Sequence, residues 1–355
     1  MVQGFFKKAL ALLGSGVSTF VSFDFGKEKL DLLHPKPLEG EDQDLSLTTD
    51  RQVDFSVKEV LFMVKRQAKG AAPGFSGLTE EHLVEVIRGS PVALVDLTRI
   101  LVHIANNRIE DPELRKRLIT CRLIALPKIN KQGVMDNVRP VAVGESLLKL
   151  ANALALSQLK KESEAIFGDL QLGLGRKNGA DKIVHLLRKQ VEDGKLLIAL
   201  DATNGFNTPT RTSIKKQLEA HSSLEPLYHL WNLAYSKPSE LLYVHRDSPT
   251  PHVVLSRRGT RQGCPLGAFL FALAIHEAIS EANEKFKLLA IRAYIDDISI
   301  IVDNSEEAVK VVEFFKEKFR KIGVTLNPAK CEWFGCSKTY PIPEKDDKGN
   351  KHLDQ

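Results

Sequence analysis

The feature that most limits the possible folds of this chain is a pair of adjacent aspartates between two apolar segments. Asp296 and Asp297 lie between residues 289–294 and residues 298–302, and both segments are mostly apolar. Short apolar segments joined by a tight connection predict two buried strands in a hairpin. Adjacent carboxylates repel each other, so the pair is either a solvent-exposed turn or a binding site for a divalent cation, which prefers hard oxygen ligands.

A third aspartate follows another apolar segment. Residues 196–200 are all apolar, which is the pattern of a strand buried on both faces, and Asp201 comes directly after them. Three carboxylates at strand ends would suit two metal ions roughly 3.5–4 Å apart in a phosphoryl transfer. Spacing along the chain does not by itself bring Asp201 next to the other two aspartates.

The residues after the hairpin predict the fold class. Asn304, with Glu307 three residues later, is a helix start, and Gly323 ends that helix. Its apolar positions are Ala308, Val311, Val312, Phe315, Phe319 and Ile322. Residues 324–326 predict a further strand. Strand, hairpin, helix and strand in this order predict an α+β fold, in which an antiparallel sheet has helices on one face.

Three more elements are predicted in the first half of the chain. Thr79 begins a helix, residues 123–126 form a short strand that Pro127 stops, and residues 146–159 form a buried helix. The buried positions of the first helix are Leu83, Val86 and Ile87. Residues 24–54 have no sustained periodicity, which predicts a solvated linker or a segment that wraps around the domain.

Composition and the length of the apolar stretches argue against a membrane-spanning protein. At 355 residues and 43% hydrophobic residues the chain can bury a large core, and its net charge of +5 is compatible with polyanionic partners. No uninterrupted apolar stretch reaches the ~18 residues that a membrane span needs, so we expect no membrane partner. Residues 1–20 predict an amphipathic helix or, less simply, a targeting segment.

Four cysteines without a disulfide-like spacing indicate a reducing compartment. We therefore expect an intracellular protein, nuclear or cytoplasmic, with organellar targeting by the N-terminal segment as an alternative. Cys331 and Cys336 are close enough in sequence for a zinc site, but no second Cys or His pair is near them, so ordinary burial is the simpler interpretation.

Several motifs occur in an order typical of one family. Residues 294–297 (YIDD), preceded by residues 201–207 (DATNGFN), resemble the catalytic motifs of reverse transcriptases, most closely those of non-LTR retrotransposons. Further matches in the same order are residues 72–77 (APGFSG), 126–128 (LPK) with 139–142 (RPVA), 171–173 (QLG) with 179–180 (GA), 262–267 (QGCPLG) and 326–331 (LNPAKC). The resemblance covers about residues 60 to 336.

The resemblance implies a metal-dependent catalytic centre. Asp201, Asp296 and Asp297 would hold two Mg²⁺ (or Mn²⁺) ions, with the backbone carbonyl of Ala202 as an additional ligand. The ions would lower the pKa of a primer 3′-hydroxyl and stabilise charge on the transferring phosphate. Lys330 would protonate the departing pyrophosphate, although a lysine beside a strand is more often a plain surface residue.

The resemblance also implies a nucleotide-binding set. Lys128 and Arg139 would neutralise the triphosphate, and their alternative is a solvated surface charge. Phe206 would block a ribose 2′-hydroxyl, which favours deoxynucleotides; its alternative is core packing. Gln262 would contact the nucleotide sugar and Gly263 would allow close approach of a backbone, with a plain helix start as the alternative.

Basic clusters add candidate contacts with a nucleic-acid backbone, and their alternative is a solvated face. They are Arg115, Lys116, Arg117 and Arg122, and then Arg257, Arg258 and Arg261.

The implied architecture is a right-hand polymerase-type palm with a largely helical fingers subdomain. The predicted division is residues 1–54 for an N-terminal helix and linker, 55–195 for the fingers, 196–336 for the palm with part of the fingers, and 337–355 for a disordered tail. The thumb is apparently missing, because the residues after Cys336 are few and mostly polar.

The predicted function is an RNA-directed DNA polymerase that uses an RNA template, a DNA primer and deoxynucleoside triphosphates. The alternative is a truncated or domesticated retrotransposon-derived protein that binds nucleic acid or a partner without catalysis. RNA synthesis on an RNA template is disfavoured by Phe206.

Overall fold

The three aspartates lie at one edge of a five-stranded sheet. The computed structural model describes residues 21–41, 44–67, 70–130, 133–286, 288–335 and 339–341. The sheet has the order β11-β10-β3-β8-β7 and is antiparallel between all neighbours. Its strands are β3 (Leu196–Leu200), β7 (Ala290–Tyr294), β8 (Asp297–Val302), β10 (Glu332–Phe334) and β11 (Thr339–Pro341). The predicted hairpin and the predicted central strand are both present in this sheet.

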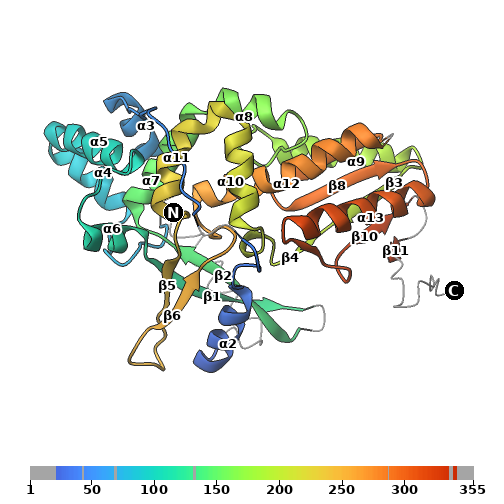
Figure 1. Ribbon diagram of the computed structural model, residues 1–355, viewed down its shortest axis with the longest axis horizontal. Coiled ribbons are helices and arrows are strands. Elements are labelled where there is room, and N and C mark those ends of the chain that lie inside the picture. The colour runs from blue at the N-terminus through green and yellow to red at the C-terminus, as the bar shows by residue number, and fades with distance from the viewer. Residues whose placement is uncertain are drawn as a thin grey trace.

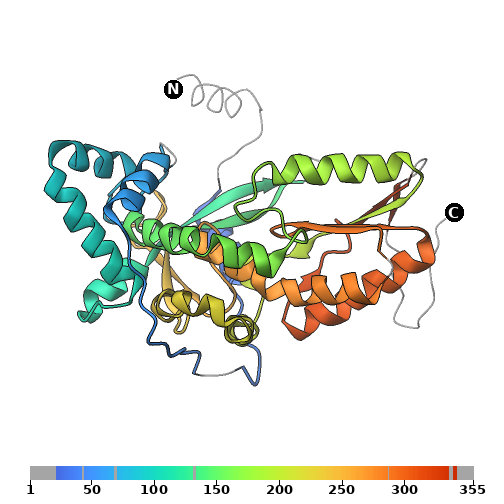
Figure 2. The same cartoon turned by 90° about the horizontal axis from the view of Figure 1, so that it is seen from above.

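Helices cover both faces of this sheet. Figure 2 shows α12 (Pro265–Lys285) and α13 (Ser305–Lys321) on one side and α9 (Gly179–Glu192) on the other. On the first side, alternate strand residues such as Ile198 and Ile300 pack against the two long helices. On the other side Ile301 is fully buried. The prediction of helices on one face was therefore incomplete. The helix α9 buries only Gly179 and Ile183, so it contributes little to the apolar pattern on which that prediction depended.

The helix α13 forms as its sequence predicts. The Asn304 side chain accepts a hydrogen bond from the Glu307 backbone N–H, and Gly323 follows the helix with φ +80°. Of the six predicted positions, Ile322 is the C-cap and is partly buried, and the other five are buried, namely Ala308, Val311, Val312, Phe315 and Phe319. The strand predicted next is β9 (Thr325–Leu326), which pairs with β4 (Ala202–Thr203) rather than with the main sheet.

A second sheet has the order β2-β1-β5-β6. Its strands are β1 (Cys121–Ile129), β2 (Met135–Val143), β5 (Ser239–Tyr243) and β6 (His252–Ser256). The strand β1 continues beyond Pro127, contrary to prediction. Because β5 pairs with β1 only as far as Leu123, one edge of β1 has no strand partner beyond it in the described residues, and a residue without an N–H is tolerated there.

The remaining helices pack together at the left of Figure 1 and around the first half of α12. They are α3 (Val57–Arg66), α4 (Glu80–Gly89), α5 (Pro91–Ala105), α6 (Pro112–Ile119), α7 (Ser146–Gln158), α8 (Lys160–Phe167), α10 (Arg211–Ala220) and α11 (Tyr228–Ala234), with 3₁₀ turns η1 (Gly205–Asn207) and η2 (Ser222–Leu227). The predicted helices α4 and α7 are present, and Thr79 caps α4. Val86 is 55% exposed, so the predicted stripe of α4 holds only in part.

Residues 24–54 differ in part from the predicted linker. Residues 23–33 form α2 (Phe23–Leu33), which packs beside β2 and β6 and buries Leu30. After it, side-chain amides hold an extended segment: Asn232 bonds the backbone N–H and carbonyl of Leu47, and Asn106 those of Val53. The wrapping part of the prediction is thus present, but the helix was missed because its stripe is short and interrupted by charges.

The ends of the chain contain one departure from prediction. Thr339–Pro341 form β11 within the tail that was predicted to be disordered. The predicted helix in residues 1–20 and the rest of the tail lie outside the described residues.

The helix α12 is long and apolar enough, by length and composition, to cross a membrane, and it alone meets this test among the described residues. Of its most apolar window, 72% is buried inside the protein. It packs as the central core helix that both large apolar clusters share.

Candidate active site

Strand register brings the three aspartates to the same edge of the sheet. Leu200 lies opposite Ile298 and Tyr294 lies opposite Asp297, so β3 ends beside the turn that joins β7 to β8. Asp201 is therefore a neighbour of Asp296 and Asp297 in space. The sequence could not supply this step, because it depends on which strands pair.

Burial and neighbouring negative charge both affect the pKa of Asp296 and Asp297. Burial among protein atoms raises the pKa of Asp297, and the negative charge of Asp201 adds to the effect. Burial likewise raises the pKa of Asp296, with the charges of Asp297 and Asp201 contributing. Both side chains can still be reached from solvent. The edge is thus an accessible concentration of negative charge that a cation would stabilise.

Lys330 lies against Asp201. The Asp201 carbonyl accepts a hydrogen bond from the Asn327 N–H, and the turn after it places Lys330 Nζ 3.3 Å from Asp201 Oδ2. Burial alone would lower the pKa of Lys330, but contacts with Lys128 and Asp201 raise it overall. Lys330 is therefore a protonated counter-ion within the predicted site.

Cys331 lies directly behind the same aspartate. Its Sγ accepts a hydrogen bond from the Asp201 N–H at 3.4 Å, and the residue is buried. Burial raises the pKa of its thiol. A buried, protonated thiol is typical of a core residue, which was the simpler of the two predicted roles; Cys336 lies outside the described residues.

Two cations from the second sheet face this edge. Lys128 on β1 and Arg139 on β2 both have exposed side chains. The pKa of Lys128 is lowered, first by its contact with Lys330 and then by burial and the positive charge of Lys330. The negative charge of Asp201 acts in the opposite direction and raises it. The charge of Arg139 in turn acts on Asp296. The two sheets thus place an acidic and a basic surface opposite each other.

The segment before α12 joins the two sheets. The Ala142 N–H donates to the Gln262 carbonyl at 2.8 Å. Gly263 has φ +106°, and a Cβ there would lie 2.7 Å from the Ala142 carbonyl oxygen. Glycine is thus needed at position 263 for close approach to β2, in addition to any approach to a ligand.

Phe206 lies on η1, just after Asp201. Its ring stacks on Phe271 of α12 with centroids 4.9 Å apart, and it is only partly buried. Its carbonyl accepts a hydrogen bond from the Thr260 N–H at 2.7 Å. The ring is therefore fixed against the core helix and retains an accessible surface.

Comparison with known proteins gives the family. A family model described as reverse transcriptase (RNA-dependent DNA polymerase) matches residues 129–343. The chain belongs to this reverse transcriptase family. The match covers all three aspartates, and the resemblance predicted from the motifs is confirmed.

Two curated relatives come from retrotransposable elements. The chain is 27% identical over 270 residues to the retrotransposable element SLACS 132 kDa protein of Trypanosoma brucei gambiense. The aligned region is 76% of this chain and 22% of that protein. It is 24% identical over 280 residues to a retrovirus-related Pol polyprotein from the type-1 retrotransposable element R2 of Popillia japonica. Here the aligned region is 74% of this chain and 37% of that protein. The chain thus spans well under half the length of either relative.

The donor set of this member of the reverse transcriptase family suits a divalent cation by its chemistry. Among the described residues, no group of three or more His, Cys, Asp or Glu side chains is arranged so that it could hold a metal ion as the side chains stand. The three carboxylates nevertheless meet at one edge, where burial and the charge of Asp201 raise the pKa of Asp296 and Asp297, and, of the three, Lys330 pairs with Asp201 alone. Hard anionic oxygens in this state are suitable ligands for Mg²⁺ or Mn²⁺.

Two of the three arginines in one predicted basic cluster are buried, whereas Arg257 is partly exposed. Arg261 is buried and donates to the carbonyls of Ile119 and Ala234, and its guanidinium lies 4.8 Å from the ring centroid of Tyr235. Arg258 is also buried and donates to the Gly323 carbonyl. These two arginines hold the fold together, so their predicted contact with a nucleic-acid backbone was wrong.

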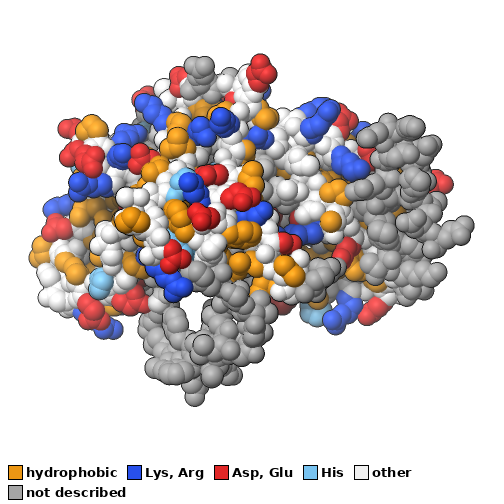
Figure 3. Space-filling view, turned by 90° about the horizontal axis from the view of Figure 1, so that it is seen from below, with side chains coloured by type: hydrophobic (Ala, Val, Ile, Leu, Met, Phe, Trp, Pro, Cys, Tyr) orange, Lys and Arg blue, Asp and Glu red, His pale blue; other side chains and the backbone are white. Residues whose placement is uncertain are grey.

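The other basic cluster is partly engaged at the surface. Lys116 pairs with Glu240, and Arg117 pairs with Glu113 on the same helix. On the face seen in Figure 3, basic and acidic side chains are interspersed rather than gathered into one basic patch. Charge distribution on that face therefore does not mark a nucleic-acid track.

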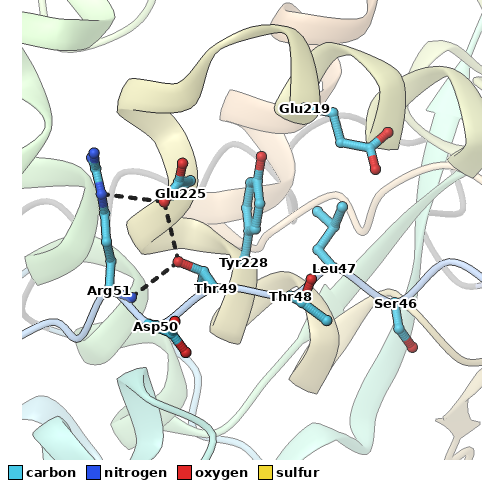
Figure 4. Close-up of a pocket in the computed structure, with 9 residues that line it drawn as sticks. All are labelled: Ser46, Leu47, Thr48, Thr49, Asp50, Arg51, Glu219, Glu225 and Tyr228. Atoms are coloured by element: carbon cyan, nitrogen blue, oxygen red, sulfur yellow. Dashed lines mark hydrogen bonds and ion pairs between the residues drawn. The ribbon is translucent and has the colours of Figure 1, made fainter.

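A separate pocket lies beside the wrapping segment. Residues 46–51 line it together with Glu219, Glu225 and Tyr228. Figure 4 shows Arg51 and Thr49 both directed at Glu225, at 3.2 Å each. None of the three aspartates lines this pocket, so it is distinct from the candidate active site.

Proposed function

We propose that this chain is the polymerase-bearing part of a retrotransposon reverse transcriptase and that it adds deoxynucleotides to a DNA primer on an RNA template. The observation that carries the proposal is the convergence of Asp201, Asp296 and Asp297 at one sheet edge, opposite Lys128 and Arg139. Opposed acidic and basic surfaces suit a substrate that combines metal ions with a triphosphate.

The carboxylates would form the metal-binding part of the site. Asp201, Asp296 and Asp297 would hold two Mg²⁺ or Mn²⁺ ions, with the Ala202 carbonyl as a further ligand. When bound, the ions would lower the pKa of the primer 3′-hydroxyl and stabilise charge on the transferring phosphate. Lys330, which pairs with Asp201, would exchange this partner for the pyrophosphate and protonate it as it leaves.

The remaining candidates would hold the nucleotide. Arg139 and Lys128 would bind the triphosphate, Arg139 in bidentate geometry. Phe206 would exclude a ribose 2′-hydroxyl, and its stack on Phe271 would keep the ring in place for that task. Gln262 would contact the sugar from the segment that lies against β2.

The sheets and helices are assigned to subdomains on the same basis. The five-stranded sheet with α9, α12 and α13 would be the palm. The second sheet and the other helices of residues 55–195 would be the fingers, to which β5 and β6 return from within the palm sequence.

Primer extension tests the proposal. Purified chain would be given an RNA template, a DNA primer, deoxynucleoside triphosphates and Mg²⁺, beside Asp296→Asn and the control Asp303→Asn. Asp303 lies just beyond β8 at its far end and pairs with Lys195. We expect Asp296→Asn to lose about a hundredfold or more in rate, because a lost metal ligand removes several kcal/mol of transition-state stabilisation. Asp303→Asn should retain the wild-type rate.

Two outcomes would contradict the proposal. One is no extension by the wild-type chain under conditions where it is folded. The other is equal extension by Asp296→Asn and wild type. Salt-sensitive binding of primer–template without incorporation would instead support a protein that binds nucleic acid without catalysis.

A further inference from the structure

The turn that presents Asp296 has a strained backbone. Ile295 has φ +59°. The other non-glycine residues with positive φ in the described part of the chain are asparagines, namely Asn107, Asn178 and Asn204. Asparagine adopts this left-handed region readily, whereas a β-branched residue does so only when its surroundings enforce it. Something in the structure must therefore hold Ile295.

One buried side chain bonds both backbone groups of Ile295. Gln171 is 2% exposed. Its Oε1 accepts a hydrogen bond from the Ile295 N–H at 2.8 Å, and its Nε2 donates to the Ile295 carbonyl at 3.1 Å. The Gly173 N–H also donates to Oε1 at 3.0 Å, which orients the amide. The Gln171 side-chain amide thus bonds the Ile295 backbone as a paired strand would bond it.

The segment that carries Gln171 is itself anchored to β7. The Ala293 N–H donates to the Leu170 carbonyl and the Leu172 N–H donates to the Ala293 carbonyl, at 2.7 and 2.8 Å. A Cβ at Gly173 would lie 2.7 Å from the Ile295 nitrogen. The backbone of this segment is therefore pressed against the turn from one side, at a distance that only glycine permits.

We propose that Gln171 is a positioning residue that holds Ile295 in its left-handed conformation and thereby fixes how Asp296 is directed relative to Asp297 and Asp201. Without the two hydrogen bonds, Ile295 would relax toward negative φ, and the next residue would turn away from the shared edge. The catalytic part of this inference rests on the proposed polymerase function. The structural part does not.

Hydrogen exchange tests the structural part without any activity. We expect the Ile295 amide to exchange at least about tenfold faster in Gln171→Met, which preserves side-chain size but cannot bond the backbone. The control is Gln217→Met, because Gln217 bonds Glu277 through an exposed amide. Unchanged protection of Ile295 in a folded Gln171→Met protein would overturn the inference.

A second variant perturbs the turn from the other side. Gly173→Ala should also speed exchange at Ile295, whereas Gly89→Ala, where a Cβ meets nothing within 4 Å, should not. This pair keeps the inference testable if Gln171→Met does not fold. Equal exchange at Ile295 in the two alanine variants would count against it.

Kinetics tests the catalytic part. We expect Gln171→Met to lower kcat by roughly tenfold to a hundredfold with little change in KM for the nucleotide, because positioning affects chemistry more than binding. Asparagine adopts the left-handed conformation readily, so Ile295→Asn should need Gln171 less. In the Ile295→Asn background, Gln171→Met should therefore lower kcat by a several-fold smaller factor. Equal losses in both backgrounds would overturn the assignment. An inactive wild type would contradict the proposed function and leave the exchange result as the test of Gln171.

Discussion

Phe206 has an observed packing role and a proposed steric role that can be separated. Its ring packs on Phe271, which is a contribution to stability, and it retains an accessible surface, which under the proposed function would face the nucleotide sugar. Core packing and a steric role were opposed readings of this residue at the level of sequence. The structure makes them compatible, because a ring that is held by Phe271 on one face would be a more rigid barrier on its accessible face.

We predict that Phe206→Val increases the use of ribonucleotides relative to deoxynucleotides, since a smaller side chain leaves room for the 2′-hydroxyl. It should also lower the free energy of unfolding by about 1–2 kcal/mol through lost ring contact. Incorporation ratios and thermal unfolding measure the two effects. Phe62→Val, at a ring that is 58% exposed, is the control. An unchanged incorporation ratio would leave Phe206 with its packing role alone.

Single residues also show what a sequence cannot contain. The motif around Asp296 is local, and so are the cap at Asn304 and the glycine that ends α13. The destinations of Arg258 and Arg261 are not local: their partners Gly323 and Ile119 lie far along the chain. A run of arginines therefore has the same appearance in sequence whether it faces solvent or the core.

At the scale of elements, one buried arginine joins several segments. Arg211 at the start of α10 is 1% exposed. Its guanidinium donates hydrogen bonds to the carbonyl oxygens of Gly259, Tyr235, Lys237 and Ser256 and to the Ser256 hydroxyl. Burial lowers the pKa of its guanidinium to about 9. These contacts fix the loop that leads to Gln262 and the start of α12.

We predict that Arg211→Lys destabilises the fold by about 3 kcal/mol or more. Lysine offers one compact ammonium in place of a planar fork, so several buried carbonyls would lose their donors. Chemical denaturation measures the effect, with the exposed Arg88→Lys as control. A loss below about 1 kcal/mol would show that water or rearranged donors replace the guanidinium.

Elements were predictable where pattern alone decides them. The helices α7 and α13 and the strands β3, β7 and β8 have long or uninterrupted apolar patterns, and they form as expected. The helix α2 and the continuation of β1 past Pro127 were missed because neighbours stabilise them: α2 packs beside the second sheet, and Pro127 lies where β1 is paired on one side.

At the scale of the whole molecule, the proposed site lies between two sheets with separate cores. Ile198, Ile300 and Phe315 belong to the core of the first sheet, and Leu123 and Leu241 to that of the second. A triphosphate held by Arg139 and by metal ions on the aspartates would contact both sheets at once.

We therefore predict that a deoxynucleoside triphosphate with Mg²⁺ stabilises the folded chain against heat. At a hundred times its Kd the gain should be about 2.7 kcal/mol by mass action. Arg139→Ala should lose most of this gain at the same ligand concentration, whereas Arg99→Ala, at an exposed pair with Asp96, should retain it. An equal gain in both variants would exclude Arg139 from the triphosphate site.

The bond between the Ala142 N–H and the Gln262 carbonyl has a consequence for tolerance to change. It belongs to a polar junction, with Arg261 and its carbonyl partners, rather than to a packed apolar interface. A main-chain hydrogen bond therefore contributes to the spacing between β2 and the segment before α12. Side chains inside either core can therefore vary in size over time with little direct effect on this bond, because neither of its atoms belongs to a side chain.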